Sequence, residues 1–518
     1  MLFNSYVFIF AFLPVTLLVF FQLGRVSGKL AAGWLAAASL FFYGWWSPAY
    51  VGLLVVSIVF NYAMGLAIVR AGAAGQGRRG KQLLAAAVAT DLAVLAYYKY
   101  ANFFVDNLNA SLGSSIGLAA IVLPLGISFF TFTQIAFLVD AWQGKAREYS
   151  FIHYGLFVTY FPHLIAGPIL HHREMMPQFG ETATYRPDYA NLAAGLTIFV
   201  IGLFKKVIIA DGVAQYVPPV FDAPQSGVPL GFIEAWCGAL AYTFQLYFDF
   251  SGYSDMAVGL SLLFGIRLPV NFHSPYKAVN IVEFWRRWHM TLSRFLRDYL
   301  YVPLGGNRRG PARRYVNLMI TMLLGGLWHG AGWTFVVWGG LHGAYLVANH
   351  AWRAARARLG QDLARSTAGG RALGCLVTFL AVVAGWVVFR ADGLDSALAI
   401  LWAMAGGNGL TVPDVWLARW GGFGAWLAQH GVDFGSTPAL PRTGVVHWIW
   451  ILLLIVWLAP NTQQIMKAAR PALGVPPDSA ASRWQWRPAA LSAAAVAVMA
   501  FAVVINLNRH SEFLYFQF

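Results

Sequence analysis

The chain contains few charged residues. Asp, Glu, Lys and Arg make up 11% of its 518 residues, whereas a typical soluble domain has about 25%. Apolar runs of about 18 residues or more recur instead, and each is long enough to cross a bilayer core of about 30 Å. A membrane β-barrel would need short alternating strands. The composition therefore predicts an all-α polytopic membrane protein with about 11 to 13 transmembrane helices, plus re-entrant and amphipathic helices.

Cysteine is also scarce. Cys237 and Cys375 are the only two, and they lie far apart in apolar runs. This argues against both a disulfide framework and a cysteine metal cluster. The net charge of +15 does not indicate nucleic-acid binding, because the basic residues lie in short loops between apolar runs, where the positive-inside rule places them.

The N-terminus lacks the features of a cleavable signal. Residues 5–23 have no basic region before them and no A-x-A cleavage site, so they are predicted to be a retained first span. Arg25 and Lys29 follow this span and no basic residue precedes it, so the N-terminus is expected outside the cytoplasm. Four further spans are expected near residues 30–47, 50–69, 83–104 and 118–139.

The C-terminal part can be oriented in the same way. The loops 353–371 and 461–487 are basic and are expected in the cytoplasm, which places the stretch 407–446 and the tail 509–518 outside. We expect one membrane domain over residues 1–518, without the internal repeat that marks many transporters. Its parts are N-terminal spans at 1–150, a core at 151–352 and C-terminal spans at 353–518.

The stretch 271–314 is the densest polar region, with nine cations against Glu283 and Asp298. A helix over about 281–301 would place Trp285, His289 and Ser293 on one stripe. Its arginines are typical of an interfacial helix with snorkelling side chains. They also suit a cytoplasmic rim that binds a polyanion such as a phosphate-bearing cofactor, and the two interpretations are compatible. The candidate phosphate ligands are Arg286, Arg287, Arg294 and Arg297.

Residues 315–352 contain no charged side chain, and this run of 38 residues suits a helical hairpin. His329 falls near its inner tip and His342 on the returning arm. An intramembrane histidine serves either a helix–helix hydrogen bond or a function. The flanking glycines favour the second, because they permit close approach by a ligand or another helix. They are Gly325, Gly326, Gly330 and Gly332.

Two further stretches carry polar groups. Asp249 and Asp255 are the only charges between Glu234 and Arg267, so they either pair with a nearby arginine or tyrosine, or orient a histidine or relay a proton. In the stretch 161–179, three histidines and a glutamate do not have H-E-x-x-H spacing, so we expect a solvated rim and no metal site. These residues are His163, His171, His172 and Glu174.

Five segments carry a family resemblance. In order they are FPHLIAGPI, YFDFSGYSDMAVGLSLLFGI, LPVNFHSPY, FWRRWHMTLSRFLRDYLYVPLGG and GLWHGAGWTFVVWGGLHG. Their order resembles that of the membrane-bound O-acyltransferases, especially the bacterial branch that O-acetylates alginate. The resemblance covers nearly the whole chain and is weakest over 353–445. It implies a ring of tilted helices around a central funnel in the bacterial inner membrane.

The resemblance also implies residue roles. The family's membrane histidine falls on His329 and its second motif histidine on His289. Asp249, Asp255, Trp328, Asn271 and Ser293 lie in the same motifs and are expected to support them. The implied donor is acetyl-CoA from the cytoplasm, and the implied partners are a periplasmic acetyltransferase of SGNH type and a polysaccharide biosynthesis or export complex.

The chemistry is consistent with these roles. Acyl transfer from a thioester needs a base for the acceptor hydroxyl and a group that stabilises the oxyanion. A neutral histidine can act as the base or carry the acetyl group covalently, and the sequence leaves both open. It also leaves open cellulose or peptidoglycan as acceptor. Outside this class, the same polar residues would suit a proton or polar-solute transporter, or a non-catalytic scaffold of an export complex.

Overall fold

The computed structural model describes residues 1–146, 150–363, 366–440, 444–476, 484–508 and 514. Nearly all regular structure in these ranges is helical, and the two strands have three residues each. The all-α polytopic membrane fold is therefore confirmed. The predicted outside position of the tail falls, except for Leu514, on residues outside the described ranges.

The elements of the N-terminal half follow in chain order, with η for 3-10 and π turns. They are η1 Phe8–Phe12, α1 Leu13–Val26, α2 Gly28–Gly44, α3 Ala49–Ala73, α4 Gly77–Leu112, α5 Ile127–Trp142, α6 Phe151–Thr159, α7 Phe161–Leu164, α8 His172–Gly180, η2 Thr182–Tyr185, α9 Tyr189–Phe204, η3 Lys205–Ala210, α10 Asp211–Ala214, α11 Pro218–Phe221 and α12 Phe232–Leu263.

The C-terminal half continues with shorter pieces, a long hairpin and a two-stranded parallel sheet. They are η4 Pro275–Lys277, α13 Ile281–Trp285, α14 Met290–Leu296, η5 Arg297–Tyr301, α15 Gly310–His329, α16 Trp333–Arg358, α17 Ala368–Arg390, α18 Leu394–Met404, β1 Thr411–Pro413, α19 Asp414–Trp420, α20 Gly422–Gln429, β2 Asp433–Gly435, α21 Gly444–Leu458, α22 Thr462–Ile465, η6 Lys467–Ala469 and α23 Ala490–Val504.

Within the described ranges, 5 helical stretches are long and apolar enough to cross a membrane. They are Phe8–Val26, Ala49–Ala73, Gly77–Leu112, Tyr189–Ala214 and Ala368–Arg390. Four shorter apolar helices, α5, α18, α21 and α23, accompany them. The total of about 11 to 13 spans stays a prediction.

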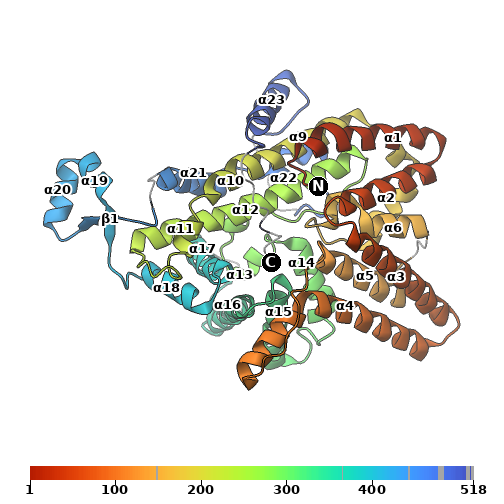
Figure 1. Ribbon diagram of the computed structural model, residues 1–518, viewed down its shortest axis with the longest axis horizontal. Coiled ribbons are helices and arrows are strands. Elements are labelled where there is room, and N and C mark those ends of the chain that lie inside the picture. Colours follow the sequence, from red (N-terminus) through yellow and green to blue (C-terminus); the bar gives the residue numbers. More distant parts are fainter. Residues whose placement is uncertain (147–149, 364–365, 441–443, 477–483, 509–513, 515–518) are drawn as a thin grey trace.

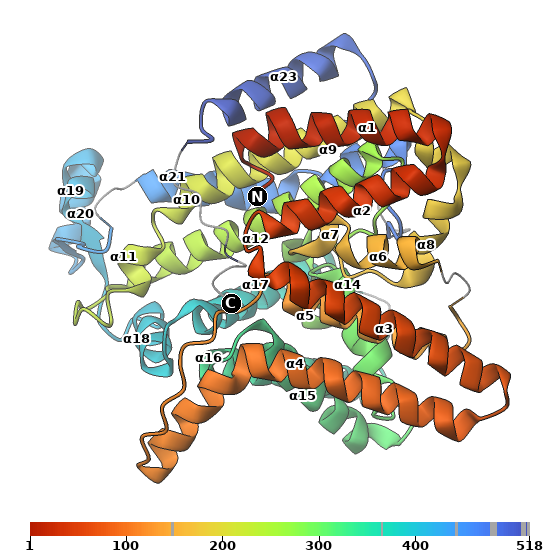
Figure 2. The same cartoon turned by 45° about the vertical axis from the view of Figure 1, so that its right-hand side comes forward.

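The helices α9 and α12 form the centre of the molecule and run side by side in both views (Figure 1, Figure 2). Gly195 and Gly202 of α9 face Gly252 and Gly259 of α12. A methyl group on any of the four would come within 2.9 Å of a backbone atom of the other helix. Small residues at this spacing let membrane helices approach closely, so these glycines determine how the centre packs.

The predicted hairpin over 315–352 is confirmed. The helices α15 and α16 are joined by residues 330–332, and His329 is the last residue of α15. In Figure 2 the long helix α4 lies beside this hairpin, although more than 200 residues separate the contacting segments. The pair α19–α20 stands apart from the other helices at the left of both views.

The continuous helix expected over 281–301 is wrong. Helix α13 ends at Trp285, and α14 begins only at Met290. Between them His289 has a left-handed backbone, with φ of 43°. Asn271 stabilises this break, because its carbonyl oxygen accepts from Met290 N (2.9 Å) and its Oδ1 from Thr291 N (3.2 Å). Trp285, His289 and Ser293 therefore do not form one helical stripe.

Candidate functional site

His329 lies at the tip of the hairpin, enclosed by aromatic rings. Its side chain is buried, and its ring packs against Trp328 of the same helix, Trp338 of α16 and Phe389 of α17. The ring centroids are 4.9, 5.2 and 5.2 Å away, respectively. Among the described residues, the hydrogen bond made by His329 to a side chain is through its backbone carbonyl and not through the imidazole. The structure thus places a titratable group in an apolar enclosure.

The end of α15 is held by helix α4. Lys99 Nζ donates to the carbonyl oxygens of Trp328 (2.5 Å) and His329 (3.1 Å), and the Tyr100 hydroxyl donates to that of Leu327 (2.9 Å). Lys99 is not among the site residues predicted from the sequence. The available signal was a lysine within the predicted span 83–104, which also contains Asp91, because a charged residue in a membrane span costs free energy unless it is paired.

The second histidine, His289, is fully buried and hydrogen-bonded at one nitrogen. Its Nδ1 lies 3.2 Å from Asn271 Oδ1, which also accepts from the Thr291 hydroxyl at 2.8 Å. Asn271 Nδ2 in turn donates to Ser254 Oγ at 3.3 Å. Within the described ranges His289 Nε2 has no hydrogen-bond partner. Asn271 therefore holds both the ring and the backbone around His289.

Trp328 lies between the two histidines. Its ring centroid is 6.2 Å from that of His289 and 4.9 Å from that of His329. The Lys99 ammonium lies 5.8 Å from the same ring, a distance typical of a cation–π contact. His289, Trp328 and His329 therefore form one cluster. Ser293 lies outside it, in the wall of a nearby cavity.

The glycines around His329 pack against protein. A methyl group on Gly326 or Gly330 would overlap atoms of Phe335, and one on Gly325 would come 3.2 Å from the Leu296 side chain. A methyl group on Gly332 would lie 3.4 Å from the Phe335 ring. Of the two explanations left open, close approach by another helix fits the contacts, because these glycines let α16 and its Phe335 lie directly on α15.

The two aspartates of α12 pair with consecutive lysines of the π turn η3. Lys206 Nζ lies 2.7 Å from Asp249 Oδ1 and 2.7 Å from Asp211 Oδ1. Lys205 Nζ lies 2.6 Å from Asp255 Oδ2, which also accepts from the Thr462 hydroxyl at 2.6 Å. The expected arginine or tyrosine partner is therefore wrong, and no described contact joins either aspartate to a histidine.

A cavity of about 510 Å³ opens beside the hairpin. Arg286, Ser293, Arg294 and Arg297 line it, whereas Arg287 does not. Its remaining lining is largely apolar, including Val282, Trp285, Met290, Leu318, Met322 and Leu346. The Trp285 ring also packs against Trp338 at 5.9 Å, and Trp338 packs against His329. The cavity and His329 are thus separated by two tryptophan rings.

The four arginines predicted to bind phosphate differ in whether their guanidinium groups already form ion pairs. Arg287 NH2 pairs with Glu283 at 2.6 Å, and Arg297 Nε pairs with Asp298 at 2.7 Å. The side-chain hydrogen bond to Asp298 raises the pKa of Arg297. Arg294 binds both oxygens of Glu174. Arg286 is exposed and makes no ion pair within the described ranges, so it is the arginine most available to a ligand.

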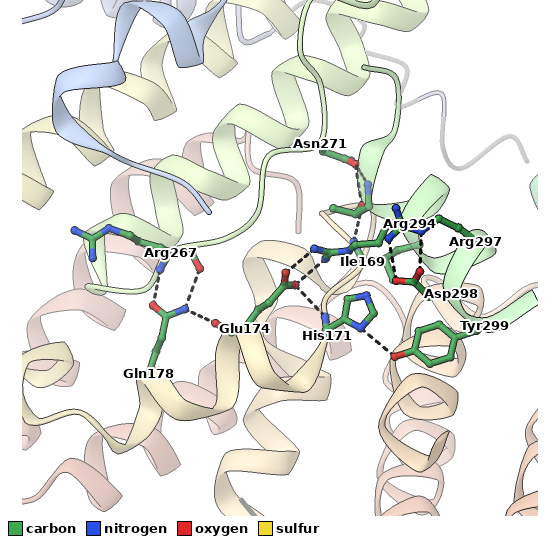
Figure 3. A network of polar contacts seen from close by, with 11 residues as sticks. Ile169, His171, Glu174, Gln178, Arg267, Asn271, Arg294, Arg297, Asp298 and Tyr299 are labelled. Carbon is green, nitrogen blue, oxygen red and sulfur yellow. Dashed lines mark hydrogen bonds and ion pairs between the residues drawn. The ribbon is translucent and has the colours of Figure 1, made fainter. Parts of the chain in front are cut away.

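The histidines of 161–179 form part of a buried network, so the expected solvated rim is wrong. His163, His171 and His172 are all buried. His171 Nδ1 lies 3.0 Å from the Tyr299 hydroxyl, and His172 Nδ1 lies 3.1 Å from Asp140 Oδ2. Figure 3 shows Glu174 joining the His171 backbone to the Arg294 guanidinium.

This network supports the segment that holds His289. Ile169 N donates to the Thr291 hydroxyl at 2.9 Å, next to the bonds of Asn271 (Figure 3). Burial and the nearby Arg294 charge lower the pKa of His171, which favours its neutral form. Within the described part of the chain, no group of three His, Cys, Asp or Glu side chains is arranged to hold a metal ion.

Comparison with known proteins adds a family and several relatives. Residues 125–386 match the model of the membrane-bound O-acyltransferase family. The chain is 46% identical to the peptidoglycan O-acetyltransferase of Helicobacter pylori, over 80% of this chain and 81% of that protein. It is 45% identical to the probable alginate O-acetylase of Azotobacter vinelandii, over 80% of each. The probable alginate O-acetylase of Pseudomonas fluorescens is 36% identical over 100% of both chains.

Proposed function

Because the chain belongs to the membrane-bound O-acyltransferase family, we propose that it takes an acetyl group from cytoplasmic acetyl-CoA and passes it across the bacterial inner membrane. A periplasmic acetyltransferase of SGNH type then transfers the acetyl group to an exported polysaccharide. Alginate is the first candidate for this polysaccharide. In this proposal the N-terminus faces the periplasm, and the chain works beside the polysaccharide biosynthesis or export complex.

One observation carries the proposal: an arginine-lined cavity lies two tryptophan rings away from an enclosed histidine. Arg286 is available to a phosphate oxygen at the cavity, and guanidinium groups suit phosphate geometry. The largely apolar remainder suits the uncharged pantetheine arm. This arm would have to pass Trp285 and Trp338 to bring its thioester to His329, so movement of these two rings is part of the proposal.

His329 is proposed as the general base. The neutral imidazole removes the proton of the acceptor hydroxyl, the hydroxyl oxygen attacks the thioester carbonyl carbon, and the carbon–sulfur bond breaks. The thiolate then takes the proton from the imidazolium. His289 is proposed to assist from the other face of Trp328, where its free Nε2 lies in the same cluster.

A second acceptor is favoured by the peptidoglycan O-acetyltransferase relative at 46% identity. Peptidoglycan is therefore the alternative acceptor for the same chemistry. The chain can be expressed in a strain that lacks its own membrane O-acetylase but makes alginate, and ester-linked acetyl measured separately on alginate and on peptidoglycan. We expect acetyl on alginate.

The role of His329 is tested in the same strain. His329→Ala should lower polymer acetylation by about 100-fold or more, because a general base contributes about 10²–10⁴-fold. The variant should reach the membrane at the wild-type level. Retained acetylation at equal abundance would contradict the proposed role of His329.

A further inference from the structure

Lys99 is a charged side chain in a helix long and apolar enough to span a membrane. Its neighbours along α4 include Ala96, Tyr97, Tyr98 and Tyr100. A lysine at the centre of a membrane helix costs about 2.5–3.5 kcal/mol by insertion scales, so its retention calls for a specific partner. The structure provides that partner at the tip of the hairpin, and the partner is a set of backbone carbonyls and not an acidic side chain.

The partner is the C-terminal end of α15. The last carbonyls of a helix have no partner in the helix and carry partial negative charge. At His329 the chain turns sharply, because Gly330 has an extended backbone with φ of −160° and ψ of 152°. Lys99 and Tyr100 together take three consecutive carbonyls, those of Leu327, Trp328 and His329.

The same ammonium also fixes the neighbouring ring. It lies 5.8 Å from the Trp328 ring, and that ring touches both histidines. Lys99 thus contacts the backbone of His329 and the side chain between His329 and His289. Both contacts come from α4, and neither is made with the imidazole of His329 itself.

We propose that Lys99 is a positioning residue for acyl transfer, which holds the backbone of Trp328 and His329 so that the imidazole keeps its reactive orientation. This inference rests on the proposed catalytic role of His329. A displacement of about 1 Å in a reacting group costs about 100-fold in rate, and Lys99 prevents such a displacement without touching the substrate.

The test compares Lys99→Met, Lys99→Arg, His329→Ala and Tyr97→Phe in inverted membrane vesicles at matched abundance. Tyr97 is a matched control because it is on the same helix, is 57% exposed and contacts the Tyr98 ring. Acetyl transfer is followed over a range of acetyl-CoA concentrations, and the thermal midpoint of each purified variant is measured.

We expect Lys99→Met to lower kcat by about 30- to 100-fold while the KM for acetyl-CoA stays within about twofold. Lys99→Arg should recover at least about a third of the wild-type kcat, because a guanidinium also donates to two carbonyls. Should Lys99→Met not accumulate, Lys99→Gln takes its place, because this side chain is shorter and uncharged and should also lower kcat with little change in the KM for acetyl-CoA.

Three outcomes would overturn the inference: a Lys99→Met variant as active as Tyr97→Phe, a change confined to the KM for acetyl-CoA, or, if Lys99→Met does not accumulate, a Lys99→Gln enzyme with the wild-type kcat. The proposed function fails separately. An active His329→Ala enzyme removes both proposals, whereas an inactive His329→Ala beside a fully active Lys99→Met removes only the role of Lys99.

Discussion

Two of the buried polar regions described in this molecule are built in opposite ways. Between α9 and α12, Lys205 and Lys206 meet Asp249 and Asp255 at 2.6–2.7 Å, and Thr462 adds a hydroxyl. At the hairpin tip, His329 has aromatic rings around its imidazole, and the hydrogen bond described for it is made by its backbone carbonyl.

The difference follows from what each region must do. Buried charges cost several kcal/mol each unless they are paired, and paired charges gain little reactivity. A base, in contrast, must have a free lone pair to accept a proton. We therefore assign the lysine–aspartate pairs to the scaffold and the histidine cluster to chemistry. The following predictions test that division.

The largest expected effect is on stability. Asp249→Ala removes one of the two described carboxylate partners of the buried Lys206, and losing one partner of a buried pair costs about 3–5 kcal/mol. We expect a strongly lowered thermal midpoint in detergent, whereas His329→Ala stays close to wild type. Asp255→Ala is the matched comparison and should cost less, because the Lys205 side chain is 15% exposed, against 4% for Lys206, and keeps the Thr462 hydroxyl. A stable but inactive Asp249→Ala enzyme would instead assign this ion pair a role in catalysis.

An intermediate effect is expected at Asn271, which belongs partly to each region. Asn271→Ala leaves the Thr291 hydroxyl and His289 Nδ1 without their shared acceptor, at a cost of about 1–3 kcal/mol. We expect both a lower thermal midpoint and reduced acetylation. Ser254→Ala, which removes only the 3.3 Å bond to the Asn271 amide, serves as control. Full activity in a destabilised Asn271→Ala enzyme would assign His289 to the scaffold.

The smallest effect is expected for two adjacent arginines. Arg286 lines the cavity and forms no ion pair within the described ranges, whereas Arg287 pairs with Glu283. Arg286→Gln should raise the KM for acetyl-CoA by about two- to fivefold, since an exposed charge contributes about 1 kcal/mol or less. Arg287→Gln should leave this KM unchanged, because Arg287 pairs with Glu283 and lies outside the cavity. Equal effects of the two substitutions would contradict the assignment of the cavity to the donor.

The membrane class, the hairpin over 315–352 and the position of His329 at its tip could be predicted from local sequence. Each depends on hydropathy or on spacing within about 40 residues. Family membership also decides in favour of an acyltransferase over the transporter and scaffold alternatives. The break at His289 could not be predicted, because it depends on Asn271, which is 18 residues away and stabilises a left-handed backbone.

The sequence by itself determined that this is a multi-pass membrane protein and which residues place titratable groups in its apolar segments. Only the tertiary structure decided which of those groups are paired. The sequence left open whether Asp249 and Asp255 pair with a nearby side chain or orient a histidine, and the structure places a lysine of η3 beside each of them. Lys99 looked like an isolated charge until it met the end of α15. Pairing depends on neighbours 40 to 260 residues away, and hydropathy contains no information about them.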